Sequence, residues 1–224
     1  MATAKAAGKG SKTKNDDHRE KLVNAYKEFV LLNGGEPPSV FQFVRELKMT
    51  EEDFYKYYGS FGSMQRDIWI RYITETLNVL HTDKLYAEYS IREKLLSFYY
   101  TLMEILKKDR SYVLLSFRDV KRPELTPVFL KSFKGEFNNY VQQLIGEGLE
   151  SEEIVKRPVI TDRYHDALWL QLVFVINFWL KDDSVNFEKT DAAIEKSVNL
   201  SFELMGRGPL DMMVDFAKFL YQNR

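Results

Sequence analysis

The chain has 224 residues, and its 32 basic and 33 acidic side chains give a formal net charge of -1. This balance excludes a polycation that would coat nucleic acid through charge alone. The absence of cysteine excludes disulfides, thiolate metal sites and cysteine nucleophiles. The longest nearly uncharged stretch, residues 167–180, is shorter than a bilayer-spanning helix. We therefore expect a soluble, cytoplasmic protein with no membrane span.

The first residues predict a tail and not a targeting signal. Residues 1–14 consist mostly of Ala, Gly, Ser and Lys and contain no apolar segment of the kind that a secretory signal needs. We expect residues 1–17 to form a disordered basic tail that precedes the folded domains.

The segment after the tail, residues 18–62, predicts three short helices. Apolar side chains spaced at i, i+3, i+4 and i+7 indicate the first of them. These side chains are Leu22, Ala25, Tyr26 and Phe29. The Asn-Gly-Gly sequence at residues 33–35 is typical of a helix end.

The second and third helices of this segment each follow a residue suited to capping. Ser39 precedes the second helix, and Thr50 precedes the third, with Asp53 at the N3 position of a capping box. Only Lys48 and Met49 separate the two helices. Short helices with so brief a connection indicate a helix-turn-helix, whose second helix enters a major groove, or else an ordinary three-helix cluster. The apolar side of the second helix comprises Val40, Phe43, Val44 and Leu47.

The rest of the chain predicts longer helices and no strand, so the fold class is all-α. Ser63, Asp162 and Thr190 are the expected N-caps of three of these helices, and Pro209 suits the first position of the last. No stretch alternates apolar and polar residues as a half-buried strand does. The expected helices cover about residues 63–80, 90–108, 111–117, 127–146, 162–180, 190–205 and 209–221.

Several residues between 19 and 65 stand at the positions of a known pattern. They are Ala25 and Phe29 late in the first helix, Gly34 after it, Ser39 as a cap, Phe43 and Val44 in the second helix, the turn Lys48, Met49 and Thr50, and the run Phe54–Tyr58. With these residues and their spacing, the segment resembles the amino-terminal domain of TetR-family transcriptional regulators.

The resemblance implies an all-α, TetR-like fold with a DNA-binding helix-turn-helix domain in residues 18–62. Residues 63–224 would then form a helical ligand-binding and dimerisation domain. The implied function is a transcriptional repressor that binds double-stranded operator DNA as a dimer and is released by a hydrophobic small-molecule effector. The DNA-binding residues that the resemblance implies are Ser39, Lys48, Thr50, Tyr55, Lys56 and Tyr57.

The expected recognition helix departs from the family pattern because it is acidic. It begins with Glu51, Glu52 and Asp53, and Phe61 replaces a lysine that contacts phosphate in the family. Residues 19–60 contain six basic and seven acidic side chains, which disfavours a module whose affinity comes from neutralising phosphates. The alternative function is therefore a TetR-fold protein that binds lipids or other hydrophobic ligands, or serves as a scaffold, and has lost DNA binding.

A dimer is expected from one helix that is apolar around nearly its whole circumference. Such a helix must be buried on every side. Residues 167–180 have this character, and residues 190–205 form an amphipathic helix close by in sequence. We expect helices 163–181 and 190–205 to make a homodimer interface, although a central helix in a monomer would have the same pattern.

A ligand site is expected among the aromatic residues of the larger domain, where an apolar cavity would suit a hydrophobic ligand. Aromatic residues at helical spacing also occur in ordinary cores. The amides of Gln171 and Asn177 are the sharper signal, since buried amides need partners, either in a ligand or across a dimer. The predicted ligand-binding residues are Phe98, Tyr99, Met103, Phe117, Phe133, Phe137, Tyr140, Trp169, Gln171 and Phe174.

Nothing in the sequence predicts an enzyme. His18, His81 and His165 are scattered, and there is no glycine-rich phosphate loop or nucleophile elbow. We therefore expect no cofactor and no metal.

Overall fold

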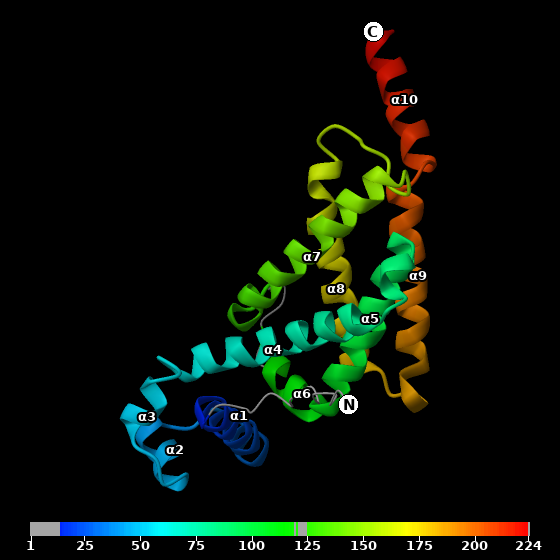
Figure 1. Cartoon of the computed structure of the whole chain (residues 1–224). Coiled ribbons are helices and arrows are strands. Elements are labelled where there is room, and N and C mark those ends of the chain that lie inside the picture. The colour runs from blue at the N-terminus through cyan, green and yellow to red at the C-terminus, as the bar shows by residue number, and fades with distance from the viewer. Residues whose placement is uncertain (1–13, 119, 121–124, 224) are drawn as a thin grey trace, which may run out of the picture. The chain divides into compact units, whose positions relative to one another are not determined.

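The computed structural model describes residues 14–118, 120 and 125–223 (Figure 1). In this part of the chain all regular structure is helical, which confirms the predicted fold class. Among the same residues, no helix combines the length and hydrophobicity that crossing a bilayer requires. The α-helices are α1 (Lys14–Asn33), α2 (Val40–Glu46), α3 (Glu51–Tyr55), α4 (Phe61–Thr82), α5 (Ile91–Lys108), α6 (Arg110–Arg118), α7 (Lys131–Glu150), α8 (Tyr164–Lys181), α9 (Glu188–Met205) and α10 (Pro209–Gln222). Single 3₁₀ turns are η1 (Tyr86–Glu88), η2 (Val128–Leu130), η3 (Thr161–Arg163) and η4 (Val185–Phe187).

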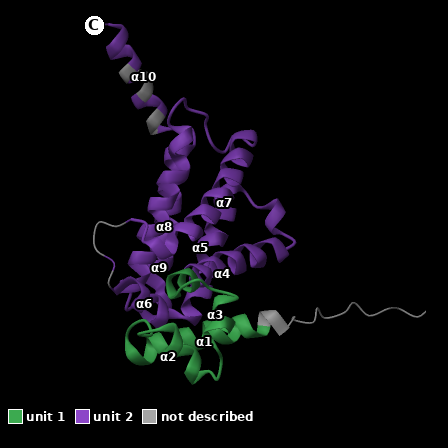
Figure 2. Ribbon diagram, turned by 90° about the vertical axis from the view of Figure 1, so that its left-hand side faces the viewer, with its two compact units in different colours: residues 1–65 green, residues 66–224 purple. Residues whose placement is uncertain are grey.

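The described residues form two compact units, one ending at Gln65 and the other beginning at Arg66 (Figure 2). The boundary lies within α4, which contributes residues to both. Residues 1–13 of the expected tail lie outside the described residues. Residues 14–17 belong to α1, so the helix begins earlier than predicted.

The N-terminal unit has an aromatic core. The ring of Phe61 lies edge-on to Phe43 and Phe54, with centroid separations of 5.4 and 5.5 Å, and stacks on Tyr26 at 5.6 Å. Phe61, which replaces a phosphate-contacting lysine of the family pattern, therefore packs inside this unit. Other buried side chains of the unit are Leu22, Val23, Val30, Val44 and Tyr58.

Three of the predicted helix caps are wrong, and two of them, Ser63 and Asp162, fail for the same reason. The cap of α4 is Ser60 and not Ser63, because Ser60 Oγ accepts a hydrogen bond from the Ser63 amide at 3.2 Å and the helix begins at Phe61. Asp162 lies inside η3, and α8 starts after it without a side-chain cap. In both places the local sequence offers more than one polar residue near the helix start, so spacing alone does not select the cap.

Thr190 is not a cap either. Its hydrogen bonds stabilise the connection between α8 and α9. It lies in the first turn of α9, where its hydroxyl donates to Asp182 Oδ2 at 2.6 Å and its amide to the same oxygen at 2.9 Å. The other oxygen of Asp182 accepts from the amide and hydroxyl of Ser184 at 2.9 and 2.6 Å. One buried carboxylate thus joins the end of α8 to the start of α9.

The core of the C-terminal unit centres on α8, which packs against α7 and α9, while α5 packs against α9 and α7 (Figure 1). As the sequence predicts, α8 is apolar almost all round. Among the described residues only one side of α8 is covered, since Leu170 is 48% exposed and Phe174 is 50% exposed. The buried side comprises Leu168, Trp169, Leu172, Val175, Ile176 and Trp179.

The junction between α9 and α10 is held by Arg157, which is 5% exposed. Its guanidinium donates to the carbonyl groups at the end of α9 and to Asp211 in the first turn of α10. From this junction α10 continues away from the body formed by α5, α7, α8 and α9 (Figure 1).

Candidate nucleic-acid interface and ligand cavity

The helix-turn-helix geometry expected from the sequence is present in the N-terminal unit. Ser39 caps α2, with Oγ accepting from the Gln42 amide at 3.2 Å. The chain then turns sharply at Lys48, whose φ of 56° lies in the left-handed region that non-glycine residues seldom occupy. The Met49 amide donates to the Val44 carbonyl at 2.9 Å and closes the turn.

The start of α3 is a complete capping box. The Asp53 amide donates to Thr50 Oγ1 at 3.2 Å, and the Thr50 amide donates to Asp53 Oδ2 at 3.1 Å. The Thr50 hydroxyl also donates to Asp53 Oδ2 at 2.8 Å. Hydrogen bonds from Thr50, and then from Lys56, lower the pKa of Asp53 to about 2. The carboxylate is therefore charged at any pH above the acid range.

Two acidic residues of α3 form ion pairs with Lys56. Its Nζ lies 3.1 Å from Asp53 Oδ1 and 3.5 Å from Glu52 Oε1. The hydrogen bond to Asp53, followed by the two negative charges, raises the pKa of Lys56. A phosphate would have to compete with these carboxylates for the same ammonium group.

The structure places all six predicted DNA-binding residues in the N-terminal unit, between the start of α2 and the residues just after α3. Tyr55 is 54% exposed, and Lys48, Thr50 and Lys56 are also exposed, whereas Ser39 and Tyr57 are half-buried. Phe54 and Tyr58 face the core instead. The outward side of α3 thus presents a phenol, a threonine and lysines beside carboxylates.

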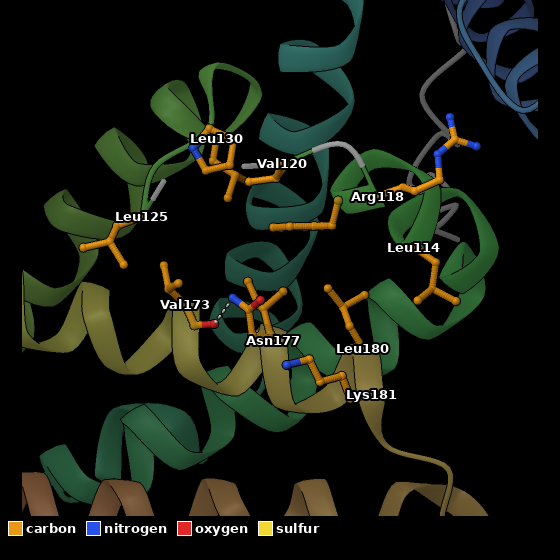
Figure 3. A pocket seen from close by; sticks show the side chains of 12 residues that line it. Leu114, Arg118, Val120, Leu125, Leu130, Val173, Asn177, Leu180 and Lys181 are labelled. Atoms are coloured by element: carbon orange, nitrogen blue, oxygen red, sulfur yellow. Dashed lines mark hydrogen bonds between the residues drawn. The ribbon is translucent and has the colours of Figure 1, made fainter. Parts of the chain in front are cut away.

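A cavity of about 570 Å³ lies in the C-terminal unit, where described residues of α6, α8 and the stretch 125–130 line it (Figure 3). Its size is within the usual range for small-molecule sites. Of the residues predicted to bind ligand, Phe117 lines it. The lining residues are Leu114, Phe117, Arg118, Val120, Leu125, Pro127, Leu130, Val173, Ile176, Asn177, Leu180 and Lys181.

The other predicted ligand residues lie in two further places. Gln171 and Phe174 line a surface groove of about 620 Å³ between α8 and α9. The remaining residues are buried in the packed core of the C-terminal unit, and their role as ligand contacts stays a prediction. These are Phe98, Tyr99, Met103, Phe133, Phe137, Tyr140 and Trp169.

The packed aromatic core is tight around Tyr140. Its ring stacks on Phe98 with centroids 4.8 Å apart, and its hydroxyl donates to the Lys94 carbonyl at 3.1 Å and pairs with the Tyr86 hydroxyl at 2.8 Å. The neighbouring Tyr99 hydroxyl is buried without a hydrogen-bond partner among the described residues. Burial raises the pKa of Tyr99, so this phenol is neutral in the folded protein.

Trp69 connects α4 with the wall of the cavity. Its ring lies edge-on to Phe117 at 5.6 Å and contacts Phe129 and Phe133 at 5.5 and 5.9 Å between centroids. Trp69 is fully buried, so a shift of Phe117 toward or away from the cavity must be accommodated by this indole.

The two amides that the sequence singled out have partners within the same chain. Gln171 Nε2 donates to Ser197 Oγ at 3.1 Å, and the Ser201 hydroxyl donates to Gln171 Oε1 at 2.8 Å. Asn177 Nδ2 donates to the Val173 carbonyl at 2.8 Å, one turn earlier in α8. The hydrogen bonds of Gln171 therefore fasten α8 to α9.

Sequence reasoning missed Lys181 and most of the aliphatic lining of the cavity. The available signal was the position of Lys181, the first charged residue after the apolar run at residues 167–180. Placing it beside α6 required tertiary information, because residues about 60 positions apart in the sequence meet there.

Comparison with known proteins agrees with this architecture. A family model described as "Tetracyclin repressor-like, C-terminal domain" matches residues 94–220, which is more than half of the chain. No curated protein matches the sequence.

Three similar solved structures are of proteins described as TetR-family regulators. One, from Syntrophomonas wolfei, has 14% identity and a TM-score of 0.67, covering 86% of this chain and 96% of its own. Another, from Shewanella sp. PV-4, has 11% identity and a TM-score of 0.59, with coverages of 84% and 97%. A third, from Rhodococcus RHA1, has 15% identity and a TM-score of 0.52, with coverages of 87% and 98%. These likenesses show the fold, and with the family model they establish that the chain belongs to the TetR family of transcriptional regulators.

Proposed function

We propose that the protein is a transcriptional repressor that binds operator DNA as a homodimer and is released by a hydrophobic effector. The observation that carries this proposal is the α2–turn–α3 geometry, in which Lys48 occupies a left-handed turn and Tyr55 points outward from α3. An exposed phenol and lysines at the start and end of such a helix are suited to phosphate contacts, which fix the position of a protein on the duplex.

The proposed dimer uses the open side of α8 together with α9, as the helices 163–181 and 190–205 were expected to do. Leu170 and Phe174 on α8 and Leu200 and Leu204 on α9 are between 40% and 60% exposed. Exposed apolar side chains gathered on neighbouring helices indicate a protein–protein surface. Twofold symmetry would place two copies of α3 about 34 Å apart, one turn of DNA.

The proposed release acts through α4. This helix follows α3 directly in the chain and carries Trp69, which contacts Phe117 in the cavity wall. An effector that displaces Phe117 shifts Trp69, and with it α4, which changes the separation of the two recognition helices in the dimer. Operator affinity falls when that separation no longer matches the DNA turn.

Footprinting on the protein's own genomic DNA tests the repressor. We expect a specific protected site whose affinity falls steeply with salt, and weaker binding for Lys48→Ala and Tyr55→Ala. Lys84→Ala is the matched control, because Lys84 is exposed and lies in the C-terminal unit. Protein that is folded yet protects no site even at low salt would end the proposal.

Sedimentation equilibrium tests the dimer separately. Phe174→Glu and Leu200→Glu should produce monomers, since each places a charge on the α8–α9 surface. Val185→Glu is the control, because Val185 is a 76% exposed apolar residue outside that surface. Equal dissociation constants for all three variants would contradict the proposed interface.

A second function is favoured by the pairing of Lys56 with Glu52 and Asp53, which weakens the case for phosphate binding. On this reading the protein binds lipids or other hydrophobic ligands, or serves as a scaffold, without engaging DNA. Native lipid copurifying with protein that ignores DNA would support this second function over the repressor.

A further inference from the structure

The last helix, α10, carries a group of exposed apolar side chains. Met212, Met213, Phe216, Phe219 and Leu220 are each between 52% and 69% exposed among the described residues, and we call these five residues the α10 face. Figures 1 and 2 both show α10 leaving the body formed by α5, α7, α8 and α9. A contiguous apolar face of this kind on one helix indicates a contact with another molecule.

The attachment of α10 to the rest of its unit uses the opposite side of the helix. Asp211 pairs with the buried guanidinium of Arg157 at 2.7 Å, and it lies about 140° around the helix axis from Phe216. The same guanidinium donates to the last carbonyls of α9, which fixes the start of α10 against the end of α9. The α10 face therefore cannot turn onto its own subunit without breaking a buried ion pair.

The α10 face has the same spacing when it is read in either direction. Met212 and Leu220 lie four residues on either side of Phe216, and Met213 and Phe219 lie three residues on either side. The five side chains together cover about 120° around the helix, with Phe216 at the middle of that arc. Phe216 is thus the centre of the face both along the axis and around it. A face with this symmetry matches a second copy of itself, as an isologous contact requires.

We infer that α10 pairs with α10 of a second copy of this chain, in antiparallel orientation, with the twofold axis beside Phe216. An axis perpendicular to both helices places Met212 opposite the partner's Phe219, and Met213 opposite the partner's Leu220. The two Phe216 rings meet at the centre. Contacts between a methionine sulfur and an aromatic ring are favourable, as are contacts between two such rings. Parallel helices would instead place Met212 opposite the partner's Met213 and lose the sulfur–aromatic contacts.

The area and the charge of this helix both suit a second copy. The five exposed side chains offer roughly 600 Å² per copy, so two copies reach the lower end of the range for specific interfaces. A helix that lies on a membrane surface is rich in lysine and arginine on its polar side. The sequence of α10 instead contains two acidic residues and one basic residue. The inference goes beyond the proposed function, because pairing of α10 needs neither DNA nor the α8–α9 surface.

Single cysteine substitutions test the inference directly, because the chain has no cysteine of its own. Packed helices have axes about 8–10 Å apart, which brings Cα atoms at the centre of the contact within the reach of a disulfide. Under mild oxidation Phe216→Cys should form an intermolecular disulfide at least about tenfold faster than Tyr221→Cys. Tyr221 is the matched control, since it is 82% exposed and lies about 140° around the same helix from Phe216.

Mixtures of two variants, one of which carries a size tag, test the orientation. Met212→Cys mixed with Phe219→Cys should form the mixed disulfide faster than Met212→Cys mixed with Met213→Cys. The reverse order would mean parallel helices and would overturn the pairing. Adding Phe216→Glu to both members of the first mixture should abolish the link, since two charges would then face each other at the centre. A cooperative thermal unfolding transition in each variant confirms that the protein remains folded.

Two further outcomes would overturn the inference. One is a Phe216→Cys disulfide that forms no faster than that of Tyr221→Cys. The other is binding of the wild-type protein to vesicles of equal parts phosphatidylglycerol and phosphatidylcholine that Phe216→Glu abolishes, because the face would then contact lipid. The readout is the position of the disulfide, so it is independent of the operator footprint and of the Phe174→Glu variant that test the proposed function.

Discussion

Arg157 Nε donates to Asp211 Oδ1 at 2.7 Å, and this ion pair connects the loop after α7 with the first turn of α10. The same guanidinium donates to the carbonyls of Leu204, Met205 and Gly206 at 3.0, 3.2 and 2.6 Å. Tyr164 accepts a further bond at 2.8 Å. A cation this deeply buried is tolerated because these oxygens replace its water.

Removing the guanidinium of Arg157 should destabilise the folded protein. We expect Arg157→Ala to lower the free energy of unfolding by about 2–4 kcal/mol, because it leaves buried carbonyls without donors. Urea denaturation at neutral pH measures the change. Arg207→Ala is the control: its pair with Glu152 is exposed, and it should change stability by no more than about 0.5 kcal/mol. Similar losses in the two variants would show that burial of Arg157 contributes nothing.

Two glycines of α7 should respond to alanine in opposite directions. A Cβ at Gly148 would lie 2.7 Å from Ile154 Cδ1, whereas a Cβ at Gly146 would meet nothing within 4 Å. We expect Gly148→Ala to destabilise by about 1–3 kcal/mol through overpacking. Gly146→Ala should stabilise by about 0.5–1 kcal/mol through helix propensity. Thermal unfolding of both variants compares them, and a stabilising Gly148→Ala would contradict the packing described.

The carboxylate of Asp182 should make stability depend on pH in the acid range. Its pKa is lower in the folded protein than in the unfolded chain, so its stabilising effect is complete above about pH 4 and is lost as the pH falls further. We expect Asp182→Asn to lower the urea midpoint at pH 7, with the difference from wild type shrinking below pH 4. A difference that is the same at pH 7 and pH 3 would refute this assignment.

The acidic start of α3 should limit DNA affinity. Glu52→Gln leaves the capping box of Thr50 and Asp53 intact and removes one of the two acids beside Lys56. We expect operator binding to tighten by about two- to tenfold at low salt, because repulsion of phosphate falls and Lys56 is less occupied. Fluorescence anisotropy measures it, with Glu88→Gln, an exposed site in the C-terminal unit, as control. Unchanged affinity would show that α3 does not face phosphate in this way.

Local hydrogen bonds were the part of the fold that the sequence predicted best. The caps at Ser39 and Thr50 are confirmed, because each side chain bonds an amide only three residues away. Ser60 and Thr190 show where this fails. Ser60 competes with a second serine three residues later, and Thr190 takes a partner from the preceding loop. Cap prediction is reliable when no competing group lies within reach.

The candidate cavity was less accessible to sequence reasoning. Helical spacing predicts that Phe98 and Phe137 each lie on the buried face of their own helix. It does not predict that their rings lie 5.4 Å apart and fill the space between the two helices. Whether an apolar face meets another ring or an empty volume depends on how α6, α8 and residues 125–130 are placed. The same holds for Arg157, whose partners lie about 50 residues further along the chain.

The amide of Gln171 has a consequence for assembly. Ser197 accepts from the amide nitrogen and Ser201 donates to the amide oxygen. These two hydrogen bonds fix the register of α8 and α9 within one subunit. A surface that is rigid in advance loses little conformational entropy on association. A second subunit would then bind a surface that needs no rearrangement, so less of the free energy of apolar contact would be offset by lost entropy.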